Sequence, residues 1–390
     1  MPPSPGQRLV GGATAYPCQR GERPIAAPAG RILFLARRYP PCLGGIETHC
    51  YELYRRLCLR RPVRLVALRR QSLLHLAWFL PYCFVLALAL LLTGRVGVIY
   101  FGDGVAGALA PLLRPFARGV RRVVTIYGLE MSYRQPLARR LMVAGAQACE
   151  RIAVISQYTR ELVINRGIPA SKLVTIHLGV EPVTLAADRE AELAAAFAAR
   201  HGVVFGRDRV LLNFGRQVKR KGVAEFLEHG MPRLAPDIRL FIGGRGPELP
   251  RIAAVCQQLG LGSRVVLLGP IPDDELAMLR QRADLFLMPN VALAGDVEGF
   301  GQTQLECMHA GTPVVAFAVD ALVESVREGG YLVPAGDYAA FVDCIHAFFA
   351  LPAAGRLAKE EEARAYVRRE YSWERTTDHY VDIFDGRYPH

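Results

Sequence analysis

The stretch ADLFLMPNVALAGDVEGFGQTQLECMHAG, residues 283–311, decides how this chain is expected to fold. It begins with a short apolar run that ends in a turn, and its last nine residues have the apolar spacing of a buried helix stopped by glycine. Between them, Glu298 and Glu306 bracket a Gly-Phe-Gly turn. Two carboxylates eight positions apart would share a face of one continuous helix by chance, but the glycines argue against an unbroken helix. We predict a strand, a turn and a new helix whose free amides meet a diphosphate or sugar.

The same alternation of apolar runs and longer amphipathic segments extends along the chain, as in parallel strands joined by crossover helices. The predicted strands are 31–36, 63–68, 97–101, 122–126, 151–155 and 173–176, followed by 209–214, 238–242, 264–268, 284–288, 313–317 and 330–333. They predict an α/β protein with two doubly wound, Rossmann-like domains facing a cleft, divided near residues 180–187. Ligands of such sheets collect at the carboxyl ends of the strands, so the loops there are the candidate site.

Length and composition agree with this organisation. At 390 residues the chain is too long for one ordinary core, and 51% hydrophobic with 22% charged residues is typical of a folded globular protein. We expect a disordered leader in residues 1–29, which are rich in Pro, Gly and Ala, and two domains in residues 30–185 and 186–370. Nine scattered cysteines without a C-x-x-C pair favour reduced thiols in a cytoplasmic protein over a disulfide or zinc framework.

The net charge of +12 is unevenly distributed. Residues 1–185 carry 25 Lys and Arg against 8 Asp and Glu, a net +17, whereas residues 186–390 carry 23 against 28, a net −5. No zinc-finger spacing, aromatic RNA-binding motif or basic heptad accompanies the basic half, so no nucleic-acid partner is expected. An anionic membrane surface or acceptor fits better, although the ratio of 44 Arg to 4 Lys indicates codon bias as a partial cause.

The most apolar segment is LLHLAWFLPYCFVLALALLL, residues 73–92, which just reaches the ~20 apolar residues needed to cross a bilayer. Seven arginines between positions 55 and 70 precede it, as on the cytoplasmic side of a membrane. A crossing would place the strands predicted at 31–36 and 97–101 on opposite sides of the membrane. We therefore favour a buried or monotopic helix over a true span, and we predict peripheral docking on the inner face of the cytoplasmic membrane.

Three other loops also join a predicted strand to a helix. GRQVKRKG (215–222) carries four cations in six residues, which suits a pyrophosphate, although a solvated basic loop has the same composition. RLFIGGRGPE (239–248) opens from a strand into a glycine-rich turn, which alone is a weak signal. In PPCLGGIETH (40–49), Gly44 and Gly45 can present bare amides to a phosphate or a sugar hydroxyl at a helix N-terminus.

Together and in this order, these segments resemble the retaining nucleotide-sugar glycosyltransferases of family 4, which have the two-domain GT-B fold. The resemblance covers residues 31 to about 386. It is carried by GGIE (44–47), AVISQYT (153–159), GRQVKRKG (215–222), GGRGPE (243–248), ADLFLMPN (283–290) and the Glu-x7-Glu pair (298–306). YSWERTTDHYVDIF (371–384) resembles the family's terminal helix, so residues 371–390 are expected to cross back onto the first domain.

The resemblance implies a donor site that draws on both domains. Arg216 and Lys221 would hold the donor diphosphate and stabilise the leaving nucleotide, Glu298 would bind hydroxyls of the donor sugar, and Glu306 would bind the ribose. The other donor-binding residues implied are Gly44, Gly45, Gly246, Pro270, Ile271, Phe300, Gly301 and Gln302. No metal, cofactor or protein nucleophile is expected, because cations and helix amides offset the leaving charge and the acceptor attacks on the face that the phosphate leaves.

Two positions depart from the family pattern. Tyr127, in VVTIYGLE (123–130), stands where many members carry a histidine that contacts the donor sugar or assists at the reacting centre. Tyr127 stays a catalytic candidate, since a phenol can make such a contact. Leu-Gly-Val-Glu (178–181) replaces the family's Asn-Gly-Val-Asp, and the neighbouring His177 is expected to be structural.

The resulting prediction is a hexosyltransferase that moves a hexose from GDP-mannose or a UDP-hexose to a lipid-linked or envelope glycan acceptor. The form DVEGFG resembles mannosyltransferases that use GDP-mannose. One alternative is a nucleotide-sugar-binding protein without transfer activity, which the replacement at Tyr127 motivates. The other is a nucleotide-sugar epimerase with the GT-B architecture, against which the ordered Glu-x7-Glu and basic-loop motifs argue.

Overall fold

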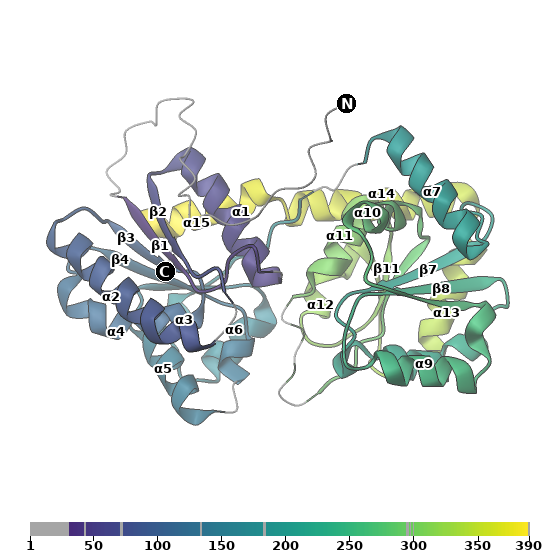
Figure 1. Ribbon diagram of the computed structural model, residues 1–390, viewed down its shortest axis with the longest axis horizontal. Helices are drawn as coiled ribbons and strands as arrows, with labels where there is room; N and C mark the ends of the chain where they lie inside the picture. The colour runs from purple at the N-terminus through teal and green to yellow at the C-terminus, as the bar shows by residue number, and fades with distance from the viewer. Residues whose placement is uncertain are drawn as a thin grey trace.

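The structure is a computed structural model that describes residues 31–388 apart from 43, 71–72, 133–134, 182–184, 294–295, 297 and 299. The leader predicted at residues 1–29 lies outside the described residues. The described chain forms two lobes, each built on a parallel six-stranded sheet with helices on its faces (Figure 1). The prediction of two doubly wound α/β domains is confirmed, and all twelve predicted strands are present to within one residue at either end.

The first lobe contains a sheet in the order β2-β1-β3-β4-β5-β6. Its strands are β1 (Ile32–Ala36), β2 (Val63–Ala67), β3 (Val98–Phe101), β4 (Arg121–Ile126), β5 (Arg151–Val154) and β6 (Leu173–Thr175). Its helices are α1 (Gly45–Arg60), α2 (Leu76–Leu92), α3 (Gly104–Gly107), α4 (Ala110–Leu113), α5 (Pro136–Gln147) and α6 (Gln157–Ile164), with 3-10 turns η1 (Leu73–His75), η2 (Arg114–Phe116), η3 (Leu129–Ser132) and η4 (Ala170–Lys172).

Alternate residues of these strands face two separate cores. Phe34 and Tyr100 pack beneath α1, whereas Leu33 and Phe101 pack against the layer that contains α2. This is the period of two that a β-strand imposes on its side chains. Because both faces of the sheet are buried, the strands are continuous apolar runs, which is why they were recognisable in the sequence.

The second lobe contains a sheet in the order β12-β11-β10-β7-β8-β9. Its strands are β7 (Arg209–Phe214), β8 (Ile238–Gly243), β9 (Val265–Gly269), β10 (Leu285–Met288), β11 (Val314–Phe317) and β12 (Gly330–Val333). Its helices are α7 (Ala187–His201), α8 (Val223–His229), α9 (Leu249–Gln258), α10 (Asp273–Arg282), α11 (Gln302–Ala310), α12 (Leu322–Ser325), α13 (Tyr338–Ala350) and α14 (Ala353–Glu370), with 3-10 turns η5 (Lys219–Lys221), η6 (Met231–Arg233), η7 (Leu261–Ser263) and η8 (Arg327–Gly329).

The last helix, α15 (Trp373–Asp385), returns to the first lobe and lies beside α1 (Figure 1). Tyr380 of this helix is fully buried, and its hydroxyl is 2.9 Å from Thr125 Oγ1 on β4. Where the chain re-enters the lobe, the Val180 amide donates to the Tyr371 carbonyl at 2.8 Å. The two lobes are therefore joined by two crossings of the chain that lie side by side.

The apolar segment predicted at residues 73–92 forms η1 and α2, which join β2 to β3. Both strands pair with β1 in one sheet. One side of α2 is buried, including Phe79 and Cys83, and the other exposes Trp78, Tyr82 and Val85. Among the described residues, no single helix is long and apolar enough to cross a membrane. In this part of the chain, only α13 and α14 taken together have the length and apolar composition of a span, and they are bent by 117° relative to each other.

Candidate active site

The loop that follows β7 is locked against the loop that follows β10. Gly222 has φ +61°, and a Cβ there would lie 1.9 Å from the Pro289 carbonyl oxygen, so only glycine fits. The Val291 amide also donates to the Arg220 carbonyl at 2.9 Å. These contacts bring the basic loop 215–222 to the loop that carries Glu298.

The centre of the site is a buried cluster of charges around Glu298. Lys221 Nζ lies 2.6 Å and Arg220 Nε 3.4 Å from Glu298 Oε2, to which Asn290 Nδ2 donates at 3.2 Å. Burial disfavours the charged carboxylate, but Lys221 and Arg220 outweigh burial and hold the pKa of Glu298 below its usual value. The Glu298 carboxylate is therefore ionised at neutral pH, and its contacts with Lys221, Arg220 and Asn290 fix its orientation.

Glu306 stands in a different environment, one turn into α11. Its carboxylate forms an ion pair with Arg280 of α10, whose guanidinium lies over the Phe214 ring. Burial raises the pKa of Glu306 above its usual value, and Arg280 opposes this rise. The two glutamates of the motif have different partners, as expected if their roles differ.

The cations of the basic loop divide into two kinds. Arg216 and Lys219 are exposed, and neither side chain has a hydrogen bond or ion pair with a described residue. Lys221 and Arg220 are both 8% exposed and are committed to Glu298. Arg216 and Lys219 are thus the cations of this loop whose side chains are free to meet a ligand.

The helix predicted after the Gly-Phe-Gly turn is present, because α11 begins at Gln302 directly after Gly301. The Phe300 ring is 2% exposed, and Gln304 Nε2 donates to the Phe300 carbonyl at 2.9 Å. From the other lobe, Gly45 at the start of α1 approaches Gln302, since a Cβ on Gly45 would lie 3.4 Å from Gln302 Oε1. The two glycine-rich helix starts therefore face each other across the lobes.

The remaining predicted donor residues lie on adjacent loops. Gly246 packs against the basic loop so closely that a Cβ would lie 1.9 Å from the Gln217 carbonyl oxygen. Ile271 packs over Gly243 at the end of β8, and Pro270 is exposed. Gly44 is exposed beside the Glu47 carboxylate.

Tyr127, directly after β4, is buried in an apolar cluster that continues from the first lobe into the core of the second. Its ring is 4% exposed and meets His49 edge-on at 5.7 Å. The hydroxyl lies near the Cys50 thiol and has no oxygen or nitrogen partner among the described residues, and burial raises its pKa well above the usual value. Its contact with the donor sugar stays a prediction, since no contact with the Glu298 cluster is present in the described structure.

Several residues of the site were not assigned from the sequence. Arg220 and Asn290 lie in the motifs GRQVKRKG (215–222) and ADLFLMPN (283–290). Their position after a predicted strand was the sequence signal that could have identified them as site residues. Asp320, which follows β11, accepts a hydrogen bond from the Glu298 amide at 2.9 Å, and only its position after a strand pointed to it. Within the described part of the chain, no three His, Cys, Asp or Glu side chains are grouped to hold a metal ion.

Comparison with known proteins agrees with this geometry. A model of Glycosyltransferase Family 4 matches residues 43–183, and one of Glycosyl transferases group 1 matches residues 208–350. The GDP-mannose-dependent alpha-(1-6)-phosphatidylinositol monomannoside mannosyltransferase of Mycolicibacterium smegmatis is 31% identical over 294 residues, 72% of this chain and 75% of that protein. The chain belongs to glycosyltransferase family 4. The phosphatidyl-myo-inositol mannosyltransferase of Mycobacterium leprae matches this glycosyltransferase at 38% identity over 130 residues, 32% of the chain and 33% of that protein.

Solved structures confirm the GT-B fold of the glycosyltransferase. Anabaena HepE in complex with UDP and glucose has a TM-score of 0.71 at 18% identity, covering 92% of this chain and 100% of that one. Sucrose-phosphate synthase from Thermosynechococcus elongatus has a TM-score of 0.70 at 21% identity, covering 92% and 99%. At these identities the likeness concerns the fold alone.

Proposed function

We propose that this glycosyltransferase transfers mannose from GDP-mannose to a lipid-linked acceptor at a membrane surface, with retention at the anomeric carbon. The observation that carries the proposal is the placing of Lys221 against Glu298 in the loop before α11, where cations for a diphosphate meet a carboxylate for sugar hydroxyls. The Mycolicibacterium smegmatis relative uses GDP-mannose and a phosphatidylinositol mannoside, which supports this donor and acceptor. A UDP-hexose is the second donor candidate, since HepE binds UDP and glucose.

In this proposal different residues of the site bind different parts of the donor molecule. Arg216, exposed and unpaired in the described structure, takes the diphosphate together with Lys221. The Glu298 carboxylate and the amides at the start of α11 bind the mannose hydroxyls, and Glu306 binds the ribose. Gly45 approaches the phosphates from the other lobe.

The transfer step exchanges one bond from the anomeric carbon to oxygen for another and moves one proton. An acceptor hydroxyl oxygen bonds to the anomeric carbon on the face from which the phosphate departs, the bond from that carbon to the β-phosphate oxygen breaks, and the hydroxyl proton passes to the leaving phosphate. Lys221, Arg216 and the α11 amides stabilise the charge that develops on the nucleotide, which is electrostatic catalysis without a protein nucleophile. We propose that these groups suffice without a divalent metal ion.

The acceptor side of the proposal rests on an apolar face of the first lobe. Leu74, Trp78, Tyr82 and Val85 are exposed in a stripe along η1 and α2. The neighbouring helices continue it with exposed Leu112, Phe116, Leu137 and Leu141. Exposed arginines accompany this face: Arg70, Arg95, Arg114, Arg118 and Arg140.

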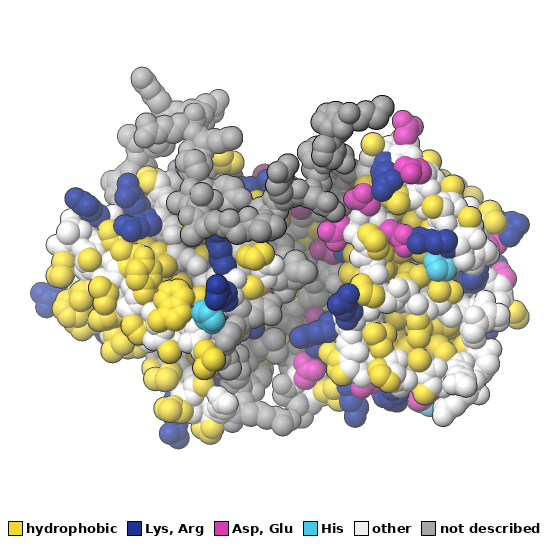
Figure 2. All heavy atoms as spheres, viewed as in Figure 1, with side chains coloured by type: hydrophobic (Ala, Val, Ile, Leu, Met, Phe, Trp, Pro, Cys, Tyr) yellow, Lys and Arg dark blue, Asp and Glu magenta, His cyan; other side chains and the backbone are white. Residues whose placement is uncertain are grey.

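The charge around this apolar face has one sign. Between residues 73 and 141 the chain contains only two acidic residues, Asp103 and Glu130, and both are buried. Figure 2 shows hydrophobic side chains gathered on this lobe, with Lys and Arg among them. An apolar stripe within a basic surface suits the headgroup region of an anionic bilayer, and we propose that the enzyme docks there from the cytoplasmic side.

Vesicle binding tests the docking surface. Trp78→Asp combined with Val85→Asp is expected to weaken co-sedimentation with phosphatidylcholine vesicles containing phosphatidylglycerol by at least about tenfold, because two large apolar side chains no longer enter the interface. Leu357→Asp, at an exposed leucine of α14 in the other lobe, is the matched control and should bind as the wild type does. Equal binding by all three proteins would exclude docking through α2.

A donor panel tests the transfer reaction. The purified protein is incubated with radiolabelled GDP-mannose, UDP-glucose or UDP-galactose and a membrane lipid extract, in buffer with and without EDTA. Labelled lipid is expected from GDP-mannose in both buffers, with an α-anomeric product by NMR, and Glu298→Ala is expected to lose it.

The other outcomes separate the alternatives. Donor binding without nucleotide release above the Glu298→Ala level would indicate a binding protein. Release of free nucleotide without sugar transfer would favour the epimerase. Labelled lipid from UDP-glucose alone would replace the donor in the proposal.

A further inference from the structure

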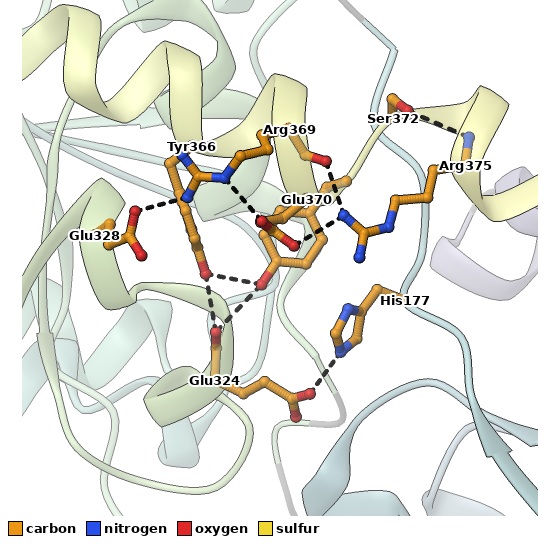
Figure 3. A network of polar contacts seen from close by, with 9 residues as sticks. His177, Glu324, Glu328, Tyr366, Arg369, Glu370, Ser372 and Arg375 are labelled. Atoms are coloured by element: carbon orange, nitrogen blue, oxygen red, sulfur yellow. Dashed lines mark hydrogen bonds and ion pairs between the residues drawn. The ribbon is translucent and has the colours of Figure 1, made fainter.

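One carboxylate of the second lobe is held by two groups of the first. Glu324 of α12 is 7% exposed, and its Oε1 atom lies 2.5 Å from His177 Nε2, just beyond β6 (Figure 3). Its Oε2 atom accepts a hydrogen bond from the Gln157 amide, the first of α6, at 2.6 Å. Both contacts exist only while the lobes are together.

His177 also reaches the loop that carries Glu298. Its ring stacks on the Phe300 ring with centroids 5.4 Å apart and planes 13° apart. Tyr371 meets Phe300 edge-on at 5.5 Å, so Phe300 is enclosed by two rings from the junction of the lobes. The Tyr371 hydroxyl donates to the Glu324 carbonyl at 3.2 Å, which ties the second ring to the same short helix.

A second connection runs from α6 to the same loop. The Asp320 carboxylate accepts the Glu298 amide and lies beside the Tyr158 phenol of α6. Burial and this carboxylate together raise the pKa of Tyr158. Through Asp320 the first turn of α6 is linked to Glu298, and through Glu324 and His177 it is linked to Phe300.

We infer that His177 is a positioning residue for sugar transfer, which holds Glu298 and Phe300 in their donor-binding positions by stacking on Phe300 and hydrogen-bonding to Glu324. Separation of the lobes breaks both contacts of the Glu324 carboxylate and uncovers one face of Phe300. The arrangement of the lobes and the sugar-binding carboxylate are thereby coupled. The inference rests on the proposed function, in which Glu298 contacts the donor sugar.

A purely structural role for His177 makes a different prediction. A residue that only stabilises the fold affects GDP and GDP-mannose alike, whereas a residue that positions Glu298 affects the ligand that carries the sugar. Two variants separate the contacts: His177→Phe keeps the aromatic stack and loses the hydrogen bond, and His177→Ala loses both. His229→Ala, at an exposed histidine of α8, is the matched control.

The affinities of each protein for GDP and GDP-mannose are measured by titration calorimetry, with melting temperatures to monitor folding. We expect GDP-mannose affinity to fall about threefold to tenfold in His177→Phe and up to about a hundredfold in His177→Ala, from the loss of one hydrogen bond and then of one ring contact. GDP affinity should change by less than about threefold, since GDP lacks the sugar. Glu324→Gln, which keeps polar atoms at both contacts, should lie between the wild type and His177→Phe.

Equal losses for GDP and GDP-mannose, or unchanged affinity for both in folded His177→Ala, would overturn the inference. The pair UDP and UDP-glucose is titrated in parallel, and the comparison is judged on the pair that the wild type binds. A wild type that binds the sugar nucleotide but transfers nothing contradicts the proposed function alone. A wild type that binds neither pair contradicts both.

Discussion

Replacing Lys221 by methionine tests whether the Glu298 cluster is held by charge pairing. Methionine keeps most of the aliphatic stem and removes the ammonium group, which lies 2.6 Å from Glu298 Oε2. Both side chains of the pair are 10% exposed, so the remaining carboxylate stays buried. Removing one partner of a buried ion pair costs about 3–5 kcal/mol, and the lower end is expected because Arg220 and Asn290 remain.

The expected loss of about 3 kcal/mol converts into a measurable shift of the melting temperature. For a lobe of this size, each kcal/mol lowers the midpoint by about 2–4 °C, which gives a fall of about 6–12 °C by calorimetry at pH 7. Adding Glu298→Gln removes the uncompensated charge, so the double variant should lose less than the sum of the two single variants. Strictly additive losses would refute the pairing.

The pH dependence of the same comparison has a defined sign. Lys221 and Arg220 hold the pKa of Glu298 below its usual value, against burial. A depressed carboxyl pKa contributes stability above the unfolded pKa, and that contribution is lost as the pH falls through the folded pKa. The difference between wild type and Lys221→Met should be largest at neutral pH and shrink in acid. A difference independent of pH would contradict the electrostatic account.

Three further predictions follow from the geometry of single positions. Arg216→Ala should leave the melting temperature unchanged to within about 1 °C, because the Arg216 side chain has no partner among the described residues. The same variant should lose most of the thermal stabilisation that GDP gives the wild type. A lower melting temperature without GDP would instead show a structural role for Arg216. Burial raises the pKa of Glu130 to about 7, so the free energy of unfolding should fall as the pH rises from about 4.5 to 7. Glu130→Gln should reduce this pH dependence in urea unfolding measured across the same range. Gly246→Ala places a Cβ 1.9 Å from the Gln217 carbonyl oxygen and should lower the melting temperature. The control Gly262→Ala has open space around its new Cβ and should not lower it. Equal melting temperatures would show that the loops carrying Gly246 and Gln217 separate freely.

The strands and the loops at their carboxyl ends were predictable because their signals are local. A strand buried on both faces is an apolar run, and a parallel sheet brings the carboxyl ends of its strands to one edge. The order of the motifs then pointed to family 4 and to Glu298, Glu306 and the basic loop. The start of a helix after the Gly-Phe-Gly turn was readable for the same reason, since glycine next to a helical apolar pattern marks a boundary.

The sequence did not predict which cations of the basic loop are paired and which are free. Arg216, Lys219, Arg220 and Lys221 are near neighbours with similar chemistry. Only the close approach of the loop after β10 divides them into two paired and two free groups. The burial of Tyr127 against His49 of α1 likewise depends on a helix distant in sequence.

The amino-acid sequence by itself determined the two sheets, the family and the loops of the candidate donor site, because periodicity, glycine turns and motif order are properties of neighbouring residues. The tertiary structure alone decided how those loops are held. His177 follows the last strand of the first sheet, yet it stacks on Phe300 and pairs with Glu324 of the second lobe. No pattern along the chain reports such contacts, since they exist only where the two lobes meet.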